Sequence, residues 1–172
     1  MHMKYLLIFF LSILCSTVYA QHDVPATNEF KITGEIKKDL IFRISDIEKY
    51  QQTEIGDIPI KNRKGEVKDV MHNVKGVPVK TILDSIGIKV DKPKEYGEYY
   101  FVFIASDDYK NIYSWSEIFN TEVGNKLYII TGKDGKSMSQ IEDRILVYSM
   151  ADINTGLRHL KGLARIEVKR LK

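Results

Sequence analysis

The sequence predicts one α+β domain with mixed sheets and short helices. Three observations support this class: apolar runs of strand length outnumber helical patterns, the helical patterns are short, and the two kinds follow no regular alternation. A chain of 172 residues is long enough to bury a proper hydrophobic core. We expect a signal peptide over residues 1–20, a flexible leader over 21–28 and the domain over 29–172.

The first twenty residues have the pattern of a secretory signal peptide. Lys4 precedes an apolar run from Leu6 to Leu14, and Val18 to Ala20 form a small-residue cleavage site. The run is too short for a transmembrane helix, and no later run approaches the roughly 18 apolar residues that such a helix needs. Cleavage near Ala20 predicts an exported protein, periplasmic or secreted.

Cys15 is the only cysteine of the chain and lies inside this predicted signal. Lipid attachment at Cys15 is the alternative, but it needs a small residue just before the cysteine, and Leu14 stands there. Without Cys15 the mature chain has no disulfide, no cysteine-ligated zinc and no thiol nucleophile. The formal charge of +3 is interspersed along the chain and does not favour nucleic acid as a partner.

The domain opens with two predicted strands and a short helix. Phe30 to Ile36 alternates apolar and polar residues, as a half-buried strand does, and Leu40 to Ile44 is a second apolar run. Ser45 and Glu48 have the spacing of a capping box, in which the serine accepts from the backbone and the glutamate reaches back. We expect a helix from Asp46 to about Gln51.

A hairpin and the clearest helix follow. Asn62 to Gly65 has turn chemistry between the runs Ile58–Lys61 and Glu66–Val70, and Pro59 places the first strand at a sheet edge. Pro78 then opens a helix that Gly87 ends. Its apolar residues recur with helical spacing on one face: Val79, Ile82, Leu83 and Ile86.

The next segment contains the predicted central strand. Tyr99 to Ser106 is aromatic or β-branched on both faces, and Lys110 to Tyr113 can pair back with it. Ser114 and Glu117 repeat the capping-box spacing before a helix that includes Ile118 and Phe119.

A second hairpin and two closing strands complete the chain. Leu127–Thr131 and Ser137–Ile141 flank Lys133–Lys136, whose Asp-Gly pair is a strong hairpin signal. Ile145–Ser149 reads as a buried strand and Leu163–Val168 as the last one.

Between these closing strands lie the main candidate ligand-binding residues, Arg158, His159 and Lys161. Three groups that can be cationic, held close together after a glycine, are suited to the rim of an anion site, although a solvated basic loop has the same composition. Asp107, Asp108 and Tyr109 follow the central strand, where ligand contacts often occur. Here a turn is the favoured interpretation, because Asp accepts from the backbone two residues on.

Other motifs are weaker. Gly135-Lys136-Ser137 has the end of a phosphate-binding loop, but Ile130 stands where that motif requires a glycine, so a hairpin is favoured. His22, His72 and His159 lie far apart without metal-ligand spacing, so we predict no metal site, and no pattern of an activated serine predicts a catalytic residue.

Several motifs in order resemble the molybdopterin-binding domain of sulfite-oxidase-type oxidoreductases. The matching segments run over almost the whole mature chain: Phe30-x-Ile-x-Gly-x-Ile36, Lys75-Gly-Val-Pro-Val79 with Leu83, Ser106-Asp-Asp-Tyr109, Ser116-Glu-Ile118, and Gly156-Leu-Arg-His-Leu-Lys-Gly-Leu163 with Ile166-Glu-Val168. The resemblance implies an α+β fold around the family's cofactor cleft. Lys161 matches the lysine that precedes the family's last strand.

The resemblance does not carry the family's chemistry with it. Catalytic members bind molybdenum through a cysteine upstream of the Gly-Val-Pro segment, and Gln51, Gln52 and Thr53 cannot supply such a thiolate. The chain also lacks the histidine and arginine segments by which full-length members hold the pterin. Molybdopterin therefore remains implied by resemblance alone, without ligation through cysteine.

The leading hypothesis is an exported relative of this domain that does not catalyse molybdenum redox chemistry and binds a small anionic ligand or a partner protein. The alternative is a molybdopterin-dependent oxidoreductase, or a subunit of one, that holds the cofactor through Arg158 and Lys161. A third hypothesis is an adaptor in an envelope complex, using the edge strand near Pro59 or the tyrosines Tyr96, Tyr99 and Tyr100. On the leading hypothesis, Arg158→Ala and Lys161→Ala weaken anion binding with little effect on stability.

Overall fold

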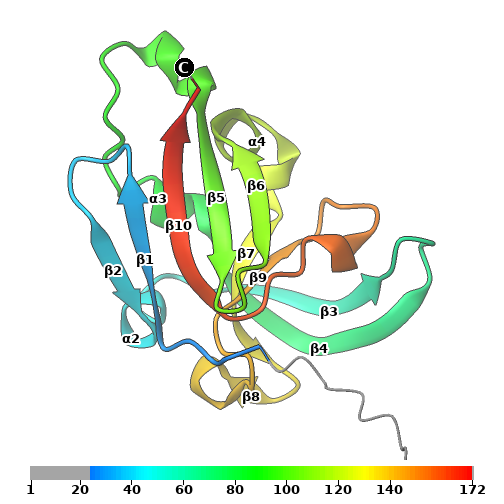
Figure 1. Cartoon of the computed structure of the whole chain (residues 1–172). Helices are drawn as coiled ribbons and strands as arrows, with labels where there is room; N and C mark the ends of the chain where they lie inside the picture. Colours follow the sequence, from blue (N-terminus) through cyan, green and yellow to red (C-terminus); the bar gives the residue numbers. More distant parts are fainter. Residues whose placement is uncertain (1–23, 172) are drawn as a thin grey trace, which may run out of the picture.

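The computed structural model describes residues 24–171, which form two five-stranded sheets (Figure 1). The first, here the β10 sheet, has the order β2-β1-β10-β5-β6. The second, here the β7 sheet, has the order β3-β4-β7-β8, and β9 also pairs with β7. The predicted signal peptide lies outside the described residues. Within them, no helix is long and apolar enough to cross a membrane.

The β10 sheet is mixed, because β1 runs parallel to β10 while its other pairs are antiparallel. Its strands are β1 (Glu29–Gly34), β2 (Leu40–Arg43), β5 (Tyr99–Ala105), β6 (Lys110–Ser114) and β10 (Leu163–Arg170). The apolar segment predicted to be central does lie inside the sheet, between β10 and β6. Its aromatic side chains Phe101 and Phe103 are fully buried.

The β7 sheet is antiparallel and carries the two hairpins. Its strands are β3 (Thr53–Lys61), β4 (Val67–Pro78), β7 (Leu127–Lys133), β8 (Lys136–Ser137) and β9 (Leu146–Ser149). The strand that contains Pro59 is an edge strand, as predicted, and its pairing with β4 shifts register at three places. Such shifts and a proline hinder pairing with a further chain.

The helices are short, which together with the mixed sheets confirms the α+β class. They are α2 (Ile44–Ile47), α3 (Val79–Leu83), α4 (Trp115–Asn120) and α5 (Glu122–Asn125), with 3₁₀ turns η1 (Pro93–Glu98), η2 (Met138–Gln140) and η3 (Thr155–Leu157). Figure 1 shows α3 and α4 behind the β10 sheet. The main core lies there and joins both sheets, while a smaller core around Ile58, Met71 and Tyr148 lies on the other face of the β7 sheet.

The capping prediction holds for α4. The Ser114 hydroxyl accepts from the Glu117 backbone N–H at 3.1 Å, and the Glu117 carboxylate accepts from the Ser114 backbone N–H at 2.7 Å. For α2 the predicted start is wrong, because the helix begins at Ile44 and Asp46, not Glu48, supplies the capping carboxylate. Its oxygen accepts from the Arg43 backbone N–H at 3.1 Å, and the helix starts two residues earlier than expected.

Two further boundaries differ from prediction. The helix α3 ends at Leu83, yet Ile86 stays buried because three-residue hydrogen bonds continue the turn before Gly87 at φ +66°. The strand β8 has only two residues, because the side chain of Gln140 accepts from the Ser137 backbone N–H at 3.0 Å and starts the turn η2. β7 instead pairs mainly with β4 and β9.

Part of the predicted flexible leader contacts the domain. The Ser106 hydroxyl donates to the Pro25 carbonyl at 2.6 Å, and the Arg144 guanidinium donates to the Asn28 side chain at 2.6 Å. Residues 24–28 therefore lie along the end of the β10 sheet where β5 turns into β6.

Candidate functional site

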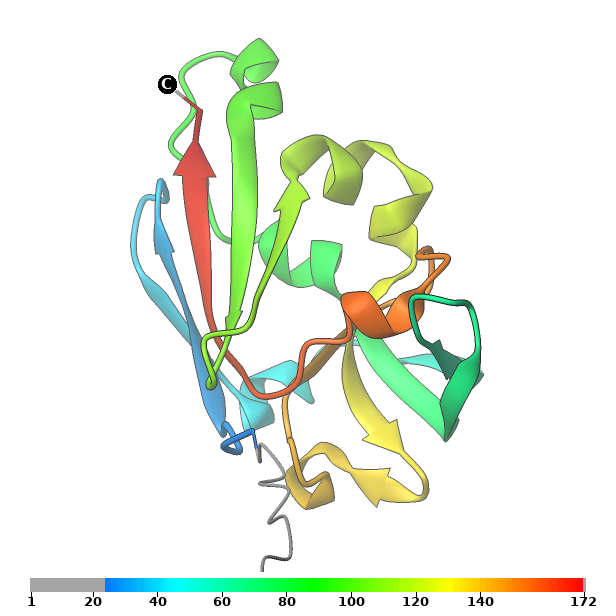
Figure 2. The same cartoon turned by 45° about the vertical axis from the view of Figure 1, so that its right-hand side comes forward.

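The loop between β9 and β10 packs against the end of the β3–β4 hairpin (Figure 2). The Thr155 hydroxyl accepts from the Lys61 backbone N–H at 3.0 Å and donates to the Pro59 carbonyl at 3.2 Å. A Cβ at Gly156 would lie 2.7 Å from the Lys61 carbonyl oxygen, which is closer than such atoms approach. The loop therefore fits against β3 only because position 156 has no side chain. These contacts hold η3 in place, and the basic residues follow it in the chain.

Arg158 is held by carboxylates on both sides. Its guanidinium donates twice to Asp152, at 2.5 and 2.6 Å, and its other nitrogen lies 3.5 Å from Glu117. Arg158 is 26% exposed and Asp152 only 11%. The hydrogen bonds to Asp152 raise the pKa of Arg158 above its ordinary value. An arginine engaged in this way is a rigid connection between loop and α4 rather than a free anion receptor.

Beneath Arg158 lies a buried tyrosine. The guanidinium carbon is 4.4 Å from the centre of the Tyr113 ring, so the cation covers the ring face. The Tyr113 hydroxyl is buried and makes no hydrogen bond within residues 24–171. Burial raises the pKa of Tyr113 above its ordinary value, which keeps the hydroxyl neutral at physiological pH.

His159 turns in the opposite direction, toward Tyr148 of β9. The two ring centres are 5.4 Å apart in an edge-to-face arrangement, and the buried Nε2 has no hydrogen-bond partner among the described residues. Burial, together with the charges of Lys161 and Lys133, lowers the pKa of His159 to about 4. His159 is therefore neutral at physiological pH, and two lysines from separate elements lie near it.

Lys161 is the more exposed cation of the loop. Its ammonium lies 3.0 Å from a carboxylate oxygen of Asp143, and its side chain is 45% exposed. Ion pairs at such positions contribute little to stability. The three predicted residues thus have different surroundings, although the charge of Lys161 acts on His159 together with that of Lys133.

The segment after β5 forms a turn. The Asp107 carboxylate accepts from the Tyr109 backbone N–H at 3.0 Å, and Asp108 adopts φ +66°. Both features belong to the turn that the sequence analysis favoured. The Tyr109 hydroxyl donates to the Leu157 carbonyl, which links this turn to η3.

A cavity of about 380 Å³ lies beside the β7–β8 hairpin, and we call it the hairpin cavity. Lys133 and Lys136 line it from the hairpin, Lys75 from β4, and Glu48 from the segment before β3. The hairpin is shaped by Asp134 and Gly135, both at positive φ, as the Asp-Gly pair predicts.

Charge and hydrogen-bonding groups in the hairpin cavity are unevenly distributed. Lys75 is paired with Glu54 at 2.7 Å, whereas no ion pair within residues 24–171 involves Lys133 or Lys136. The Thr131 hydroxyl and the Gln52 amide, hydrogen-bonded at 3.0 Å, add polar groups to the wall. The cavity therefore offers two unpaired ammonium groups beside neutral polar side chains, with Glu48 as its one carboxylate.

Sequence reasoning did not assemble this cavity. Lys75 meets the hairpin because it pairs with Gly132 across the β4–β7 ladder, a contact set by register. The available signal was Gly135-Lys136-Ser137. We interpreted these residues as a hairpin turn and not as a phosphate-binding loop. The hairpin is present, and Lys136 lines the cavity beside it.

Comparison with known proteins supports the fold alone. No family model matches the chain, and no curated protein matches it in sequence. A structural match is the crystal structure of the sulfane dehydrogenase SoxCD from Paracoccus pantotrophus, with a TM-score of 0.59 and 13% identity. The fold is of the sulfite-oxidase type. The match covers 87% of this chain but only 41% of the other, so this chain spans less than half the length of that protein.

The residues present do not fit the molybdenum cofactor that this fold implies. Residues 24–171 contain no cysteine, so they offer no thiolate for the metal, and they contain no cluster of three or more histidine, aspartate or glutamate side chains that could hold one. Arg158 and Lys161, which the resemblance suggested for the pterin, are each engaged by a carboxylate.

Proposed function

We propose that this protein is a non-catalytic binding domain that takes up a small oxyanion in the hairpin cavity. The observation that carries the proposal is the pair Lys133 and Lys136, which line one cavity without a carboxylate partner in the described part of the chain. Ammonium groups held beside hydroxyl and amide groups suit a phosphate or sulfate group, whose oxygens accept several hydrogen bonds.

The predicted basic loop does not line this cavity, but the charge of Lys161 acts on the same histidine, His159, as the charge of the cavity residue Lys133. We assign Arg158 a supporting role, because Asp152 and Glu117 neutralise it. Among the three loop residues, Lys161 is therefore the one whose removal should weaken anion binding.

Calorimetric titration with inorganic phosphate and with sulfate at low ionic strength tests the proposal. Replacing Lys133 and Lys136 together by alanine should weaken binding about tenfold or more, because each charge-assisted hydrogen bond contributes roughly 1.5–3 kcal/mol. Lys161→Ala should weaken it less. Binding that is absent from the wild type, or unchanged in the double variant, would refute the proposal.

Lys110→Ala supplies the matched control for charge. Lys110 is exposed on β6 and has no ion pair among the described residues, so its loss changes the net charge without touching the cavity. An equal loss of affinity in Lys110→Ala would mean that only net charge matters and that no specific site exists.

A partner protein is the second candidate ligand, favoured by an exposed apolar surface near η3. Tyr109 and Leu157 are joined by a hydrogen bond and are 44% and 42% exposed, and Ile153 is 87% exposed. Large apolar side chains left exposed in and beside one loop favour a protein interface there. Cross-linking in native envelope should then give a defined product that Ile153→Asp abolishes and Lys110→Ala retains.

We further propose that the protein is exported. The proposal rests on the signal-peptide pattern of residues 1–20. Fractionation of the native cells, with mass determination of the mature protein, tests it: a product that begins at Gln21 and leaves the cytoplasm is expected. A full-length cytoplasmic product would contradict the proposal.

A further inference from the structure

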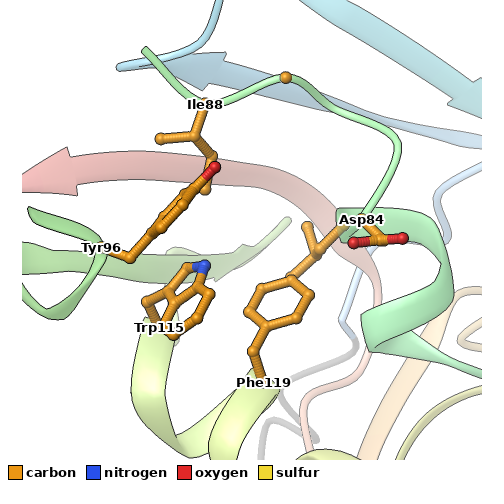
Figure 3. Close-up of a pocket in the computed structure, with 7 residues that line it drawn as sticks. Asp84, Ile88, Tyr96, Trp115 and Phe119 are labelled. Carbon is orange, nitrogen blue, oxygen red and sulfur yellow. The ribbon is translucent and has the colours of Figure 1, made fainter. Parts of the chain in front are cut away.

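A second cavity, of about 190 Å³, lies where α3, η1 and α4 meet, away from the hairpin (Figure 3). Its aromatic wall consists of Tyr96 from η1 and of Trp115 and Phe119 from α4. The rings form a continuous row, with ring centres 4.7 Å apart for Tyr96 and Trp115 and 5.1 Å for Trp115 and Phe119. We call it the aromatic cavity.

The opposite wall is aliphatic and carries one charge. Leu83 and Ile88 face the aromatic row, and Asp84, which follows the last residue of α3, is the only charged residue of the lining. The Asp84 carboxylate makes no hydrogen bond and no ion pair within residues 24–171. Lys37 packs its aliphatic stem against Gly87 near this cavity, but its ammonium is not paired with Asp84.

The aromatic wall adds two polar groups, the Trp115 N–H and the Tyr96 hydroxyl. Figure 3 shows the nitrogen edge of the Trp115 indole turned into the space between Tyr96, Phe119 and Ile88. No hydrogen bond among the described residues uses this N–H. The cavity thus combines apolar walls with two donors and a single unpaired carboxylate, the arrangement by which small-molecule sites select and orient a ligand.

We propose that the aromatic cavity binds a small organic ammonium ion with an apolar body and a hydroxyl or ether oxygen. The carboxylate of Asp84 selects the positive charge, the aromatic and aliphatic walls take the alkyl groups, and the Trp115 N–H donates to the oxygen. The rings stack on one another and do not form a cage around a bound cation. The Asp84 carboxylate, and not the ring faces, therefore determines the preference for a positive charge.

Choline and its uncharged carbon analogue 3,3-dimethyl-1-butanol form a matched pair of probes of nearly equal shape. Trp115 is the only tryptophan of the chain and lies in the cavity, so its fluorescence reports occupancy directly. We expect choline to change the emission with a dissociation constant of about 1 mM, as befits a ligand of few atoms. The uncharged analogue should bind about tenfold more weakly.

The variant Asp84→Asn keeps the shape of the side chain and removes its charge. It should weaken choline binding about tenfold and leave binding of the uncharged analogue unchanged. Asp91→Asn is the control, because Asp91 is exposed nearby and does not line the cavity. Equal binding of both probes to the wild type, an equal effect of the two variants, or no response to choline would each overturn the proposal. The comparison of probes on the wild type stands even if a variant fails to fold.

Discussion

At the scale of single residues, Arg158 changes from a candidate ligand group into a structural one. Its partner Asp152 is only 11% exposed, so Arg158→Ala leaves a nearly buried carboxylate without its cation. We predict a loss of about 2–3 kcal/mol in the free energy of unfolding, somewhat below the range for fully buried pairs. Urea denaturation at neutral pH measures it, and Lys161→Ala, which breaks a more exposed pair, should change stability by less than about 1 kcal/mol. Similar values for the two variants would restore the solvated-loop interpretation.

His159 makes stability depend on pH. Its pKa is about 4 in the folded protein, against an ordinary value of 6.5, so between these values the unfolded chain binds more protons at this position. The contribution of His159 to the free energy of unfolding should therefore be fully present above about pH 6.5. It should fall by up to about 3 kcal/mol as the pH drops toward 4. Urea denaturation across this range should show a smaller fall in His159→Gln than in the wild type. His72→Gln is the control variant. Asp57 raises the pKa of His72, so the contribution of His72 to stability is present at low pH and is lost as the pH rises.

At the scale of elements, the position of η3 depends on the close approach of Gly156 to β3. A methyl group there would meet the Lys61 carbonyl, which is fixed in the hairpin and cannot rotate away. Gly156→Ala should lower the free energy of unfolding by about 1–3 kcal/mol. Gly97→Ala is the matched control, because a Cβ at position 97 meets nothing within 4 Å. Equal melting temperatures of the two variants would show that η3 can move away from the hairpin at no cost.

Local chemistry explains which elements were predictable. The strand β5 and the cap of α4 follow from signals within a few residues: an apolar run, and a serine three positions before a glutamate. The start of α2 was missed because Asp46, and not Glu48, accepts from the backbone N–H that precedes the helix. The end of β8 was missed because Gln140 closes a turn onto Ser137. In each missed case a short-range hydrogen bond prevails over the apolar pattern.

The candidate sites were less predictable than the elements, because each depends on contacts between distant segments. The hairpin cavity requires Lys75 to meet residues about sixty positions later, and the aromatic cavity requires η1 to stack on α4. Register and packing between elements decide such contacts, and neither is written in a local pattern. The loop that contains Arg158 was identified from the sequence, but the carboxylate partners of Arg158, Asp152 and Glu117, were not. The positive charge that Arg158 offers to a ligand was therefore overestimated.

At the scale of the whole molecule, the fold and the donor residues point to different conclusions about a cofactor. The two sheets match a sulfane dehydrogenase at a TM-score of 0.59, yet residues 24–171 offer no cysteine to a metal. If the fold is sufficient for cofactor binding, protein purified from a host that makes molybdopterin will contain the cofactor. If binding requires the cysteine ligand, the purified protein will lack it. We predict molybdenum well below one atom per chain by elemental analysis, and no pterin fluorescence after denaturation, because a histidine-poor, thiolate-free site cannot replace the usual ligand. A sulfite-oxidase-type enzyme from the same host serves as the positive control for cofactor supply. Stoichiometric molybdenum and pterin in this protein would show that Arg158 and Lys161 exchange their carboxylate partners for the cofactor, and would overturn the assignment of a non-catalytic binding domain.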